Sequence, residues 1–350
     1  MSTRPGPRPQ QDYGFFGPDS VTWKVFTHPA SVTIAFQRTV LTEVLDPLLA
    51  ASVGDTGSIE RRPALRYDRT LQYVATVAFA GSEAVVAAAD VLMKVHRRIT
   101  GVEPISGERY DANDPDAQLW IHLTQWHSVL LSYEIFGPGR LPPAEEGQYW
   151  AECRRAAAFQ TIDPTAVPAD RGEMRAYYER VRPRIAGTER AQTLAAGILD
   201  AGGTLVEKGP WYLRACAPLL RVAMRKGTIA TLPRWLRTVA GVRQGRLQDA
   251  VVVALLRPGL GVLARRPTAL AALLRTISPL TYPVMAPVLL GVPPVDPVVV
   301  TPEEAWARAG LPTPRQQYDA LVAARASAPE GETAQEHAPA DGTGPLLAFG

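Results

Sequence analysis

The chain has 350 residues, of which 46% are hydrophobic and 20% charged, a composition typical of a folded globular protein and not of a disordered one. Its two cysteines, Cys153 and Cys216, exclude a disulfide framework and a four-cysteine zinc module. The formal net charge of +3 is small, and no nucleic-acid-binding module accompanies it, so nucleic acid is not an expected partner.

Helical periodicity covers nearly the whole chain, and no alternating run is long enough to indicate a sheet. The sequence therefore predicts an all-α fold with one large helical domain over 13–325, between disordered ends at 1–12 and 326–350. Capping residues, prolines and glycines place the expected helices at 18–28, 31–45, 63–80, 82–101, 114–137, 143–160, 171–185, 188–201, 211–226, 229–240, 245–257 and 267–277. The proline-rich segment 278–300 is expected to be irregular, and a last short helix is expected from Thr301.

We expect a cytoplasmic protein, because residues 1–14 lack the apolar core of a signal peptide and two cysteines suit a reducing compartment. The longest uncharged apolar run, 276–295, contains five prolines, so a transmembrane helix is not expected there. Both thiols are expected to be buried structural groups.

The charge is distributed unevenly. Residues 205–275 hold 13 Lys and Arg against Glu207 and Asp249, a local balance of +11. Such a leucine-rich, basic region could contact acidic lipid headgroups or an acidic partner. The alternative is a set of ordinary helices with solvated arginine faces.

Common catalytic signatures are missing from the sequence, including a phosphate-binding loop, His-Glu-x-x-His, Cys-x-x-Cys-His and Gly-x-Ser-x-Gly. Three of the five histidines, however, fall within 96–127. His96 and His122 each lie on an apolar helix face, where an imidazole needs a partner: a metal, porphyrin iron or a backbone carbonyl. His127 lies about 140° around the helix from His122, so the two cannot easily share one metal.

A second group of residues is Arg66, Arg69 and Thr70, which fall on one helical face. Two guanidinium groups beside a hydroxyl could hold carboxylates, for instance porphyrin propionates. The alternative is a solvated basic face that begins with Arg61-Arg62.

Four short motifs in order resemble the MpaB/rubber oxygenase family, which includes fungal oxygenases of meroterpenoid biosynthesis and the bacterial latex clearing protein. The motifs, which cover roughly 14–240, are Gly17-Pro18-Asp19-Ser20-Val21-Thr22-Trp23, Arg66-x-x-Arg69-Thr70, Val95-His96-Arg97-Arg98 and Tyr110-x-Ala112-x-Asp114-Pro115 followed by Leu119-Trp120-Ile121-His122.

The resemblance implies a globin-like helical core that holds a non-covalent haem b. It implies His96 as the axial iron ligand, with His122 as an alternative ligand or a distal group. Arg66 and Thr70 would bind the propionates, and Arg69, which replaces the lysine of the latex clearing branch, would with His122 contact iron-bound oxygen. The implied activity is an oxygenase or oxidase that uses O2 on a hydrophobic small molecule, such as a terpenoid or an aromatic secondary metabolite.

Two other functions stay open at this stage. The first is a non-catalytic helical protein that docks on an anionic membrane or a partner through 205–275. The second is a non-haem iron enzyme that uses His122 with Asp114 or Glu134, although these spacings do not match a facial triad. Neither the oligomeric state nor the substrate follows from the sequence.

Overall fold

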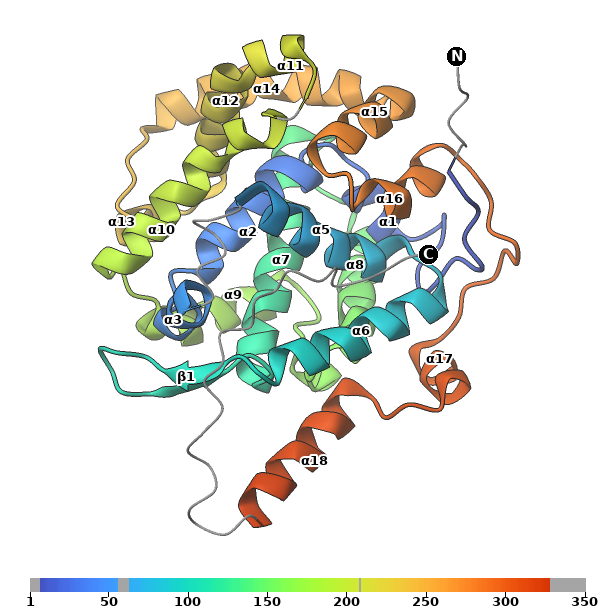
Figure 1. Ribbon diagram of the computed structural model, residues 1–350. Helices are drawn as coiled ribbons and strands as arrows, with labels where there is room; N and C mark the ends of the chain where they lie inside the picture. The colour runs from blue at the N-terminus through green and yellow to red at the C-terminus, as the bar shows by residue number, and fades with distance from the viewer. Residues whose placement is uncertain (1–6, 56–62, 208, 328–350) are drawn as a thin grey trace.

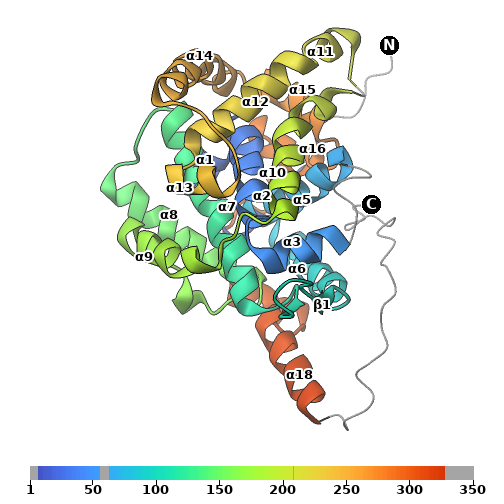
Figure 2. The ribbon, with the colours of Figure 1, turned by 90° about the vertical axis from the view of Figure 1, so that its left-hand side faces the viewer.

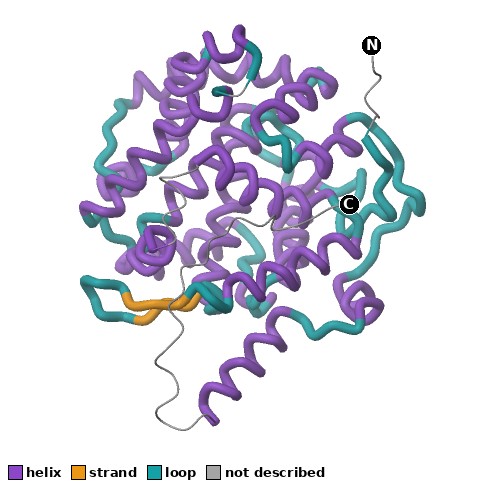
Figure 3. Tube along the Cα trace, viewed as in Figure 1, coloured by secondary structure: helices purple, strands orange, loops and turns teal. Residues whose placement is uncertain are grey.

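The computed structural model describes residues 7–55, 63–207 and 209–327, and helices make up most of the described chain, with loops between them (Figures 1 and 3). A single two-stranded antiparallel hairpin, β1 (Thr100–Val102) with β2 (Arg109–Asp111), is the exception among the described residues. The principal helices are α1 (Val21–Phe26), α2 (Phe36–Glu43), α3 (Pro47–Asp55), α5 (Pro63–Phe79), α6 (Ser82–His96), α7 (Pro115–Phe136), α8 (Pro143–Ala156), α9 (Arg171–Val181), α10 (Glu189–Asp200), α11 (Trp211–Ala215), α12 (Ala217–Thr231), α13 (Arg234–Val239), α14 (Arg246–Ala264), α15 (Pro267–Ile277), α16 (Tyr282–Leu289), α17 (Pro302–Ala309) and α18 (Pro314–Ser327). The predicted all-α class is confirmed.

Helix α7 is the centre of the molecule, and the other helices surround it (Figure 1). Asp114 caps its first turn by accepting hydrogen bonds from Asp116 N and Ala117 N, and Pro115 fits the first helical position because no backbone N–H is needed there. Its buried side chains lie all around the helix, so it is an interior helix and not an amphipathic surface helix. It packs against α2, the π-helical turn Ser31–Ala35 and α14.

Several predicted boundaries are wrong. The segment 278–300 contains α16, in which Pro283 occupies the first turn and Met285 and Ala286 are buried in the core. The helix expected at 229–240 is divided, because α12 continues to Thr231 and α13 begins after Pro233. Helix α14 extends to Ala264 despite Pro258. Cys153 is buried as expected, whereas Cys216 is exposed.

The N-terminal segment also differs from expectation. Residues 1–6 lie outside the described part, but the carbonyls of Gln10 and Gln11 accept hydrogen bonds from the backbone of 295 and 296. The Asp12 carboxylate accepts hydrogen bonds from Gly14 N, Ser82 N and the Ser82 hydroxyl. Gly14 has a φ of 64°, and a Cβ there would lie 2.1 Å from the Ala80 carbonyl oxygen, so only glycine fits. At the other end α18 continues to Ser327, and 328–350 lie outside the described residues.

Candidate functional site

The short link between α5 and α6 brings two of the predicted site residues together. Only Ala80 and Gly81 separate the helices, so the chain turns sharply there and α5 and α6 contact each other. Arg66, in the first turn of α5, is close enough to His96, the last residue of α6, to lower its pKa. Two motifs that are 30 positions apart in the sequence therefore meet at one place in the fold.

The His96 ring is held along its Nδ1 edge. Nδ1 lies 3.1 Å from Nε2 of Gln118, an amide that also donates to the Ala112 carbonyl at 2.5 Å. Burial lowers the pKa of His96 to about 4, although the charge of Asp111 and a hydrogen bond to the Ala112 carbonyl raise it. The imidazole is therefore neutral at physiological pH, which is the form that can bind a metal ion.

Glu43, at the end of α2, lies within electrostatic range of Arg66. Burial raises the pKa of Glu43 to about 7, against the effects of a hydrogen bond from Thr124 and the positive charge of Arg66. Burial also lowers the pKa of Arg66, and Glu43 opposes that shift. The two side chains thus share a desolvated environment in which their opposite charges stabilise each other. Glu43 was not among the residues predicted from the sequence.

The other residues of the Arg-x-x-Arg-Thr motif have different surroundings. Arg69 is half-buried, and Thr70 is exposed. The side chain buried in this turn is Asp68, whose carboxylate accepts hydrogen bonds from Leu280 N, Thr281 N and the Thr281 hydroxyl. Asp68 thereby fixes the start of α5 against the loop before α16.

The two histidines of α7 have separate partners. His122 Nε2 lies 2.9 Å from the Cys153 carbonyl oxygen, and a hydrogen bond with Gln160 also involves this ring. Burial lowers its pKa to about 4. His127 Nδ1 lies 3.2 Å from the Tyr178 hydroxyl. The structure therefore directs these rings to different places, as the helical spacing predicts, and satisfies His122 with protein groups.

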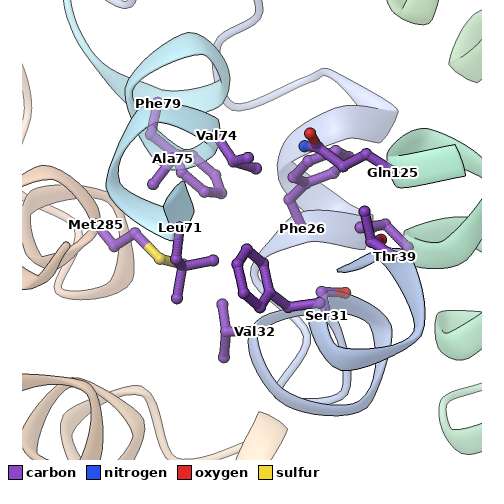
Figure 4. Close-up of a pocket in the computed structure, with 12 residues that line it drawn as sticks. Phe26, Ser31, Val32, Thr39, Leu71, Val74, Ala75, Phe79, Gln125 and Met285 are labelled. Carbon is purple, nitrogen blue, oxygen red and sulfur yellow. The ribbon is translucent and has the colours of Figure 1, made fainter. Parts of the chain in front are cut away.

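Residues of α5 and α7 line two small pockets. One has a volume of about 330 Å³ including its solvent-open part, and α5 supplies much of its wall (Figure 4). The other, of about 350 Å³, includes His122 and Gln160 in its wall. Phe26, Val74 and Gln125 line both pockets, so the two are adjacent. The first is lined by Phe26, Ser31, Val32, Phe36, Thr39, Leu71, Val74, Ala75, Phe79, Gln125, Val129 and Met285.

A chain of amides connects the second pocket to His96. Gln160 Nε2 donates to Oε1 of Gln118 at 2.9 Å, and Gln118 Nε2 contacts His96 Nδ1. Gln118, His122 and Gln125 occupy positions i, i+4 and i+7 of α7, so they form one polar stripe along this interior helix. The spacing of these two glutamines around His122 is the sequence signal that points to Gln118 as a partner of the site.

The donor set suits a group that needs one axial nitrogen and does not suit a free metal ion. No cluster of three or more His, Cys, Asp or Glu side chains forms a metal site within the described ranges. Asp114 is engaged as a helix cap, and Glu134 accepts hydrogen bonds from Arg171, so neither joins His122. A neutral imidazole with a guanidinium group in electrostatic range has the donor types that a porphyrin needs, one nitrogen for the iron and one cation for the carboxylates.

The buried histidines predict acid sensitivity. Burial lowers the pKa of both His28 and His122 to about 4, so the folded protein binds fewer protons than the unfolded chain between about pH 4 and 6.5. The free energy of unfolding should therefore fall as pH falls through this range, by about 1.4 kcal/mol per pH unit for each such histidine. Glu43, with its raised pKa, contributes in the opposite direction between about pH 4.5 and 7, but the lowered histidines outnumber it.

Urea unfolding at pH 7, 6 and 5 measures this dependence. In His28→Asn the slope of the free energy of unfolding against pH should fall by the amount that corresponds to about one bound proton. A free energy of unfolding that is constant from pH 6.5 to 5 would contradict the assigned protonation states.

The comparisons with known proteins gave one match. The family described as "ER-bound oxygenase mpaB/B'/Rubber oxygenase, catalytic domain" matches residues 23–266. No curated protein and no solved structure matched the chain. The matched range includes α5, α6 and α7, with every predicted site residue.

Proposed function

The chain belongs to the mpaB/rubber oxygenase family and carries its oxygenase catalytic domain, and from this premise we propose a haem b-dependent oxygenase or oxidase with His96 as the axial ligand. The observation that carries the proposal is the state of His96, which is neutral, held at one edge and beside the Arg66 guanidinium. Membership of this oxygenase family implies an oxidoreductase that uses O2 and a small-molecule substrate.

The axial role requires a ring nitrogen with a free lone pair, which the neutral form of the His96 imidazole has. When bound, haem would supply the redox chemistry that activates O2. Arg66 would neutralise a propionate, a role that its proximity to His96 supports, and Thr70 would be a weaker contact because its side chain is exposed.

Arg69 and His122 are proposed as the polar groups next to the reacting oxygen. His122 lies in the wall of the second pocket, and a contact with bound oxygen would replace one of its hydrogen bonds, to the Cys153 carbonyl or to Gln160. His122 is the less suitable axial ligand, because Nε2 is already directed at the Cys153 carbonyl. We propose Arg69 only on the strength of its place in the motif and its half-buried position.

The lining of the first pocket supports a hydrophobic substrate, such as a terpenoid or an aromatic secondary metabolite. Its walls are aromatic and aliphatic, and the polar side chains among them are Ser31, Thr39 and Gln125 (Figure 4). A few polar groups in an apolar pocket orient a ligand without excluding apolar substrates. A cytoplasmic location is part of the same proposal.

An optical spectrum of protein purified from haem-supplemented cells tests the proposal. We expect a Soret band of histidine-ligated haem b, which shifts after dithionite reduction and addition of carbon monoxide. Colourless protein that binds no added hemin would overturn it. Oxygen consumption with hydrophobic alkenes or phenols, measured against the haem-free protein, then tests the reaction type.

A further inference from the structure

We propose that the face formed by α11, the start of α12 and the outward side of α14 docks on an anionic lipid bilayer. This face, called here the α14 face, consists of Trp211, Tyr212, Leu219, Val222, Leu247, Val251, Leu255 and Val262, all of them exposed. None of these residues belongs to the proposed haem site, so the test of this face does not depend on haem.

Helix α14 is apolar on both of its sides. Its inward side chains, Val253, Leu256 and Leu260, pack against a small core cluster that contains Ile34 and Phe136. Its outward side chains remain in solvent, with Leu247 79%, Leu255 72% and Val262 53% exposed. Because of this double pattern, an 18-residue window of this 19-residue helix has a mean hydropathy of 1.5, and α14 is the one helix of the described chain long and apolar enough to cross a membrane. A soluble surface helix normally has a polar outer side.

Tertiary packing indicates that α14 lies along a membrane and does not cross it. The helix contacts α12, α7 and α15 along its length, and crossing a bilayer would break these contacts. Figures 1 and 2 both show α11, α12 and α14 together at one end of the molecule. Trp211, 78% exposed, and Tyr212, 55% exposed, extend this surface with amphipathic rings of the kind that favours the headgroup region.

Exposed arginines surround the α14 face. Six of them form no ion pair within the described residues: Arg214, Arg221, Arg243, Arg246, Arg265 and Arg266. Asp249, one of the two acids in this region, is already paired with Arg237. An apolar stripe with aromatic residues and an uncompensated cationic rim is complementary to the surface of a bilayer that contains anionic lipids.

The same charges argue against a second copy of the chain as the occupant. In a twofold dimer the same patch meets itself, so the arginine rims would face one another without intervening carboxylates. Such like-charge contacts cost free energy. An anionic bilayer satisfies both the apolar stripe and the cationic rim, and it is therefore the occupant that we infer.

Vesicle co-sedimentation of the full chain tests the proposal. Binding is expected to phosphatidylcholine vesicles that contain phosphatidylserine, to weaken as salt rises, and to be far weaker to phosphatidylcholine alone. Arg265→Gln with Arg266→Gln should lower the partition coefficient about 25-fold, because each arginine near the surface contributes about 1 kcal/mol. Leu255→Glu should lower it about tenfold.

Two matched controls separate this face from general effects. Ile105→Glu changes an equally exposed apolar side chain on the distant hairpin, and Arg175→Gln with Arg308→Gln removes two exposed arginines elsewhere. Both controls should bind vesicles as the unmodified protein does. Equal losses in the controls and in the α14 variants would overturn the assignment of this face.

Cys216 allows a direct reading, because it is exposed at the junction of α11 and α12 while Cys153 is buried. An environment-sensitive fluorophore on Cys216 should shift to shorter wavelength when anionic vesicles are added. No shift and no sedimentation would overturn the proposal. A concentration-dependent dimer that Leu255→Glu dissolves, in a protein that does not bind vesicles, would overturn it in favour of a second copy.

Discussion

His96→Ala should abolish stable haem binding, with the Soret absorbance per mole of protein falling to a small fraction of that of the unmodified protein. Removing a residue that only hydrogen-bonds to a metal ligand typically lowers the affinity for the metal about 10–100-fold. The loss of haem affinity in His96→Ala should be larger than that. The reason is that the two histidines of α7 already have protein partners: His122 is directed at the Cys153 carbonyl and His127 at the Tyr178 hydroxyl. Hemin titration followed by absorbance measures the effect.

His127→Ala is the matched control, because it also removes a buried neutral imidazole but should leave haem binding intact. Added imidazole should restore part of the Soret band to His96→Ala, since a free ligand can occupy the space left by the side chain. Equal haem retention in both variants would show that the axial assignment is wrong. If His122→Ala loses haem and His96→Ala retains it, then His122 is the axial ligand and His96 is not.

Asp68→Ala is expected to lower the free energy of unfolding by about 3–5 kcal/mol, the largest effect on stability that we predict. Asp68 is 3% exposed, and its carboxylate is the acceptor for three donors from Leu280 and Thr281. Removing the carboxylate leaves these donors buried without their acceptor, at a cost of about 1–3 kcal/mol each. Urea unfolding at pH 7 measures the change.

Asp319→Ala is the control for this prediction, because Asp319 is an exposed carboxylate that pairs with Arg315 within one helix. Its loss should change the free energy of unfolding by less than about 0.5 kcal/mol. Asp68→Asn, which keeps one acceptor oxygen, should fall between the two. Similar values for Asp68→Ala and Asp319→Ala would contradict the role of Asp68 in holding α5 against the loop before α16.

Local signals in the sequence were enough for most of the secondary structure. Pro115 after the Asp114 cap set the start of α7, and Thr301 with Glu304 forms the capping box predicted for the last short helix. These signals are reliable because they depend on neighbours within one helical turn. The segment that contains α16 was missed, because its prolines predict loop structure when tertiary burial is ignored.

Some residues of the candidate site could be predicted from local sequence patterns, and others could not. The motifs identified His96 and Arg66, and the short link between α5 and α6 explains why they meet. Glu43 and Gln160 come from other segments of the chain, and no local pattern connects them to His96. Their participation depends on long-range packing around α7.

By itself the sequence determined the helical class, most helix starts, the family and the basic character of 205–275, because each of these depends on composition, short spacing or motif order. Only the tertiary structure decided which side chains are desolvated together and which remain in water. That distinction placed Glu43 beside Arg66 and buried Asp68 next to an exposed Thr70. It also left the outer side of α14 uncovered. The physical reason is that burial is a property of the whole packed chain, whereas a helical period reports only the side chains of its own segment.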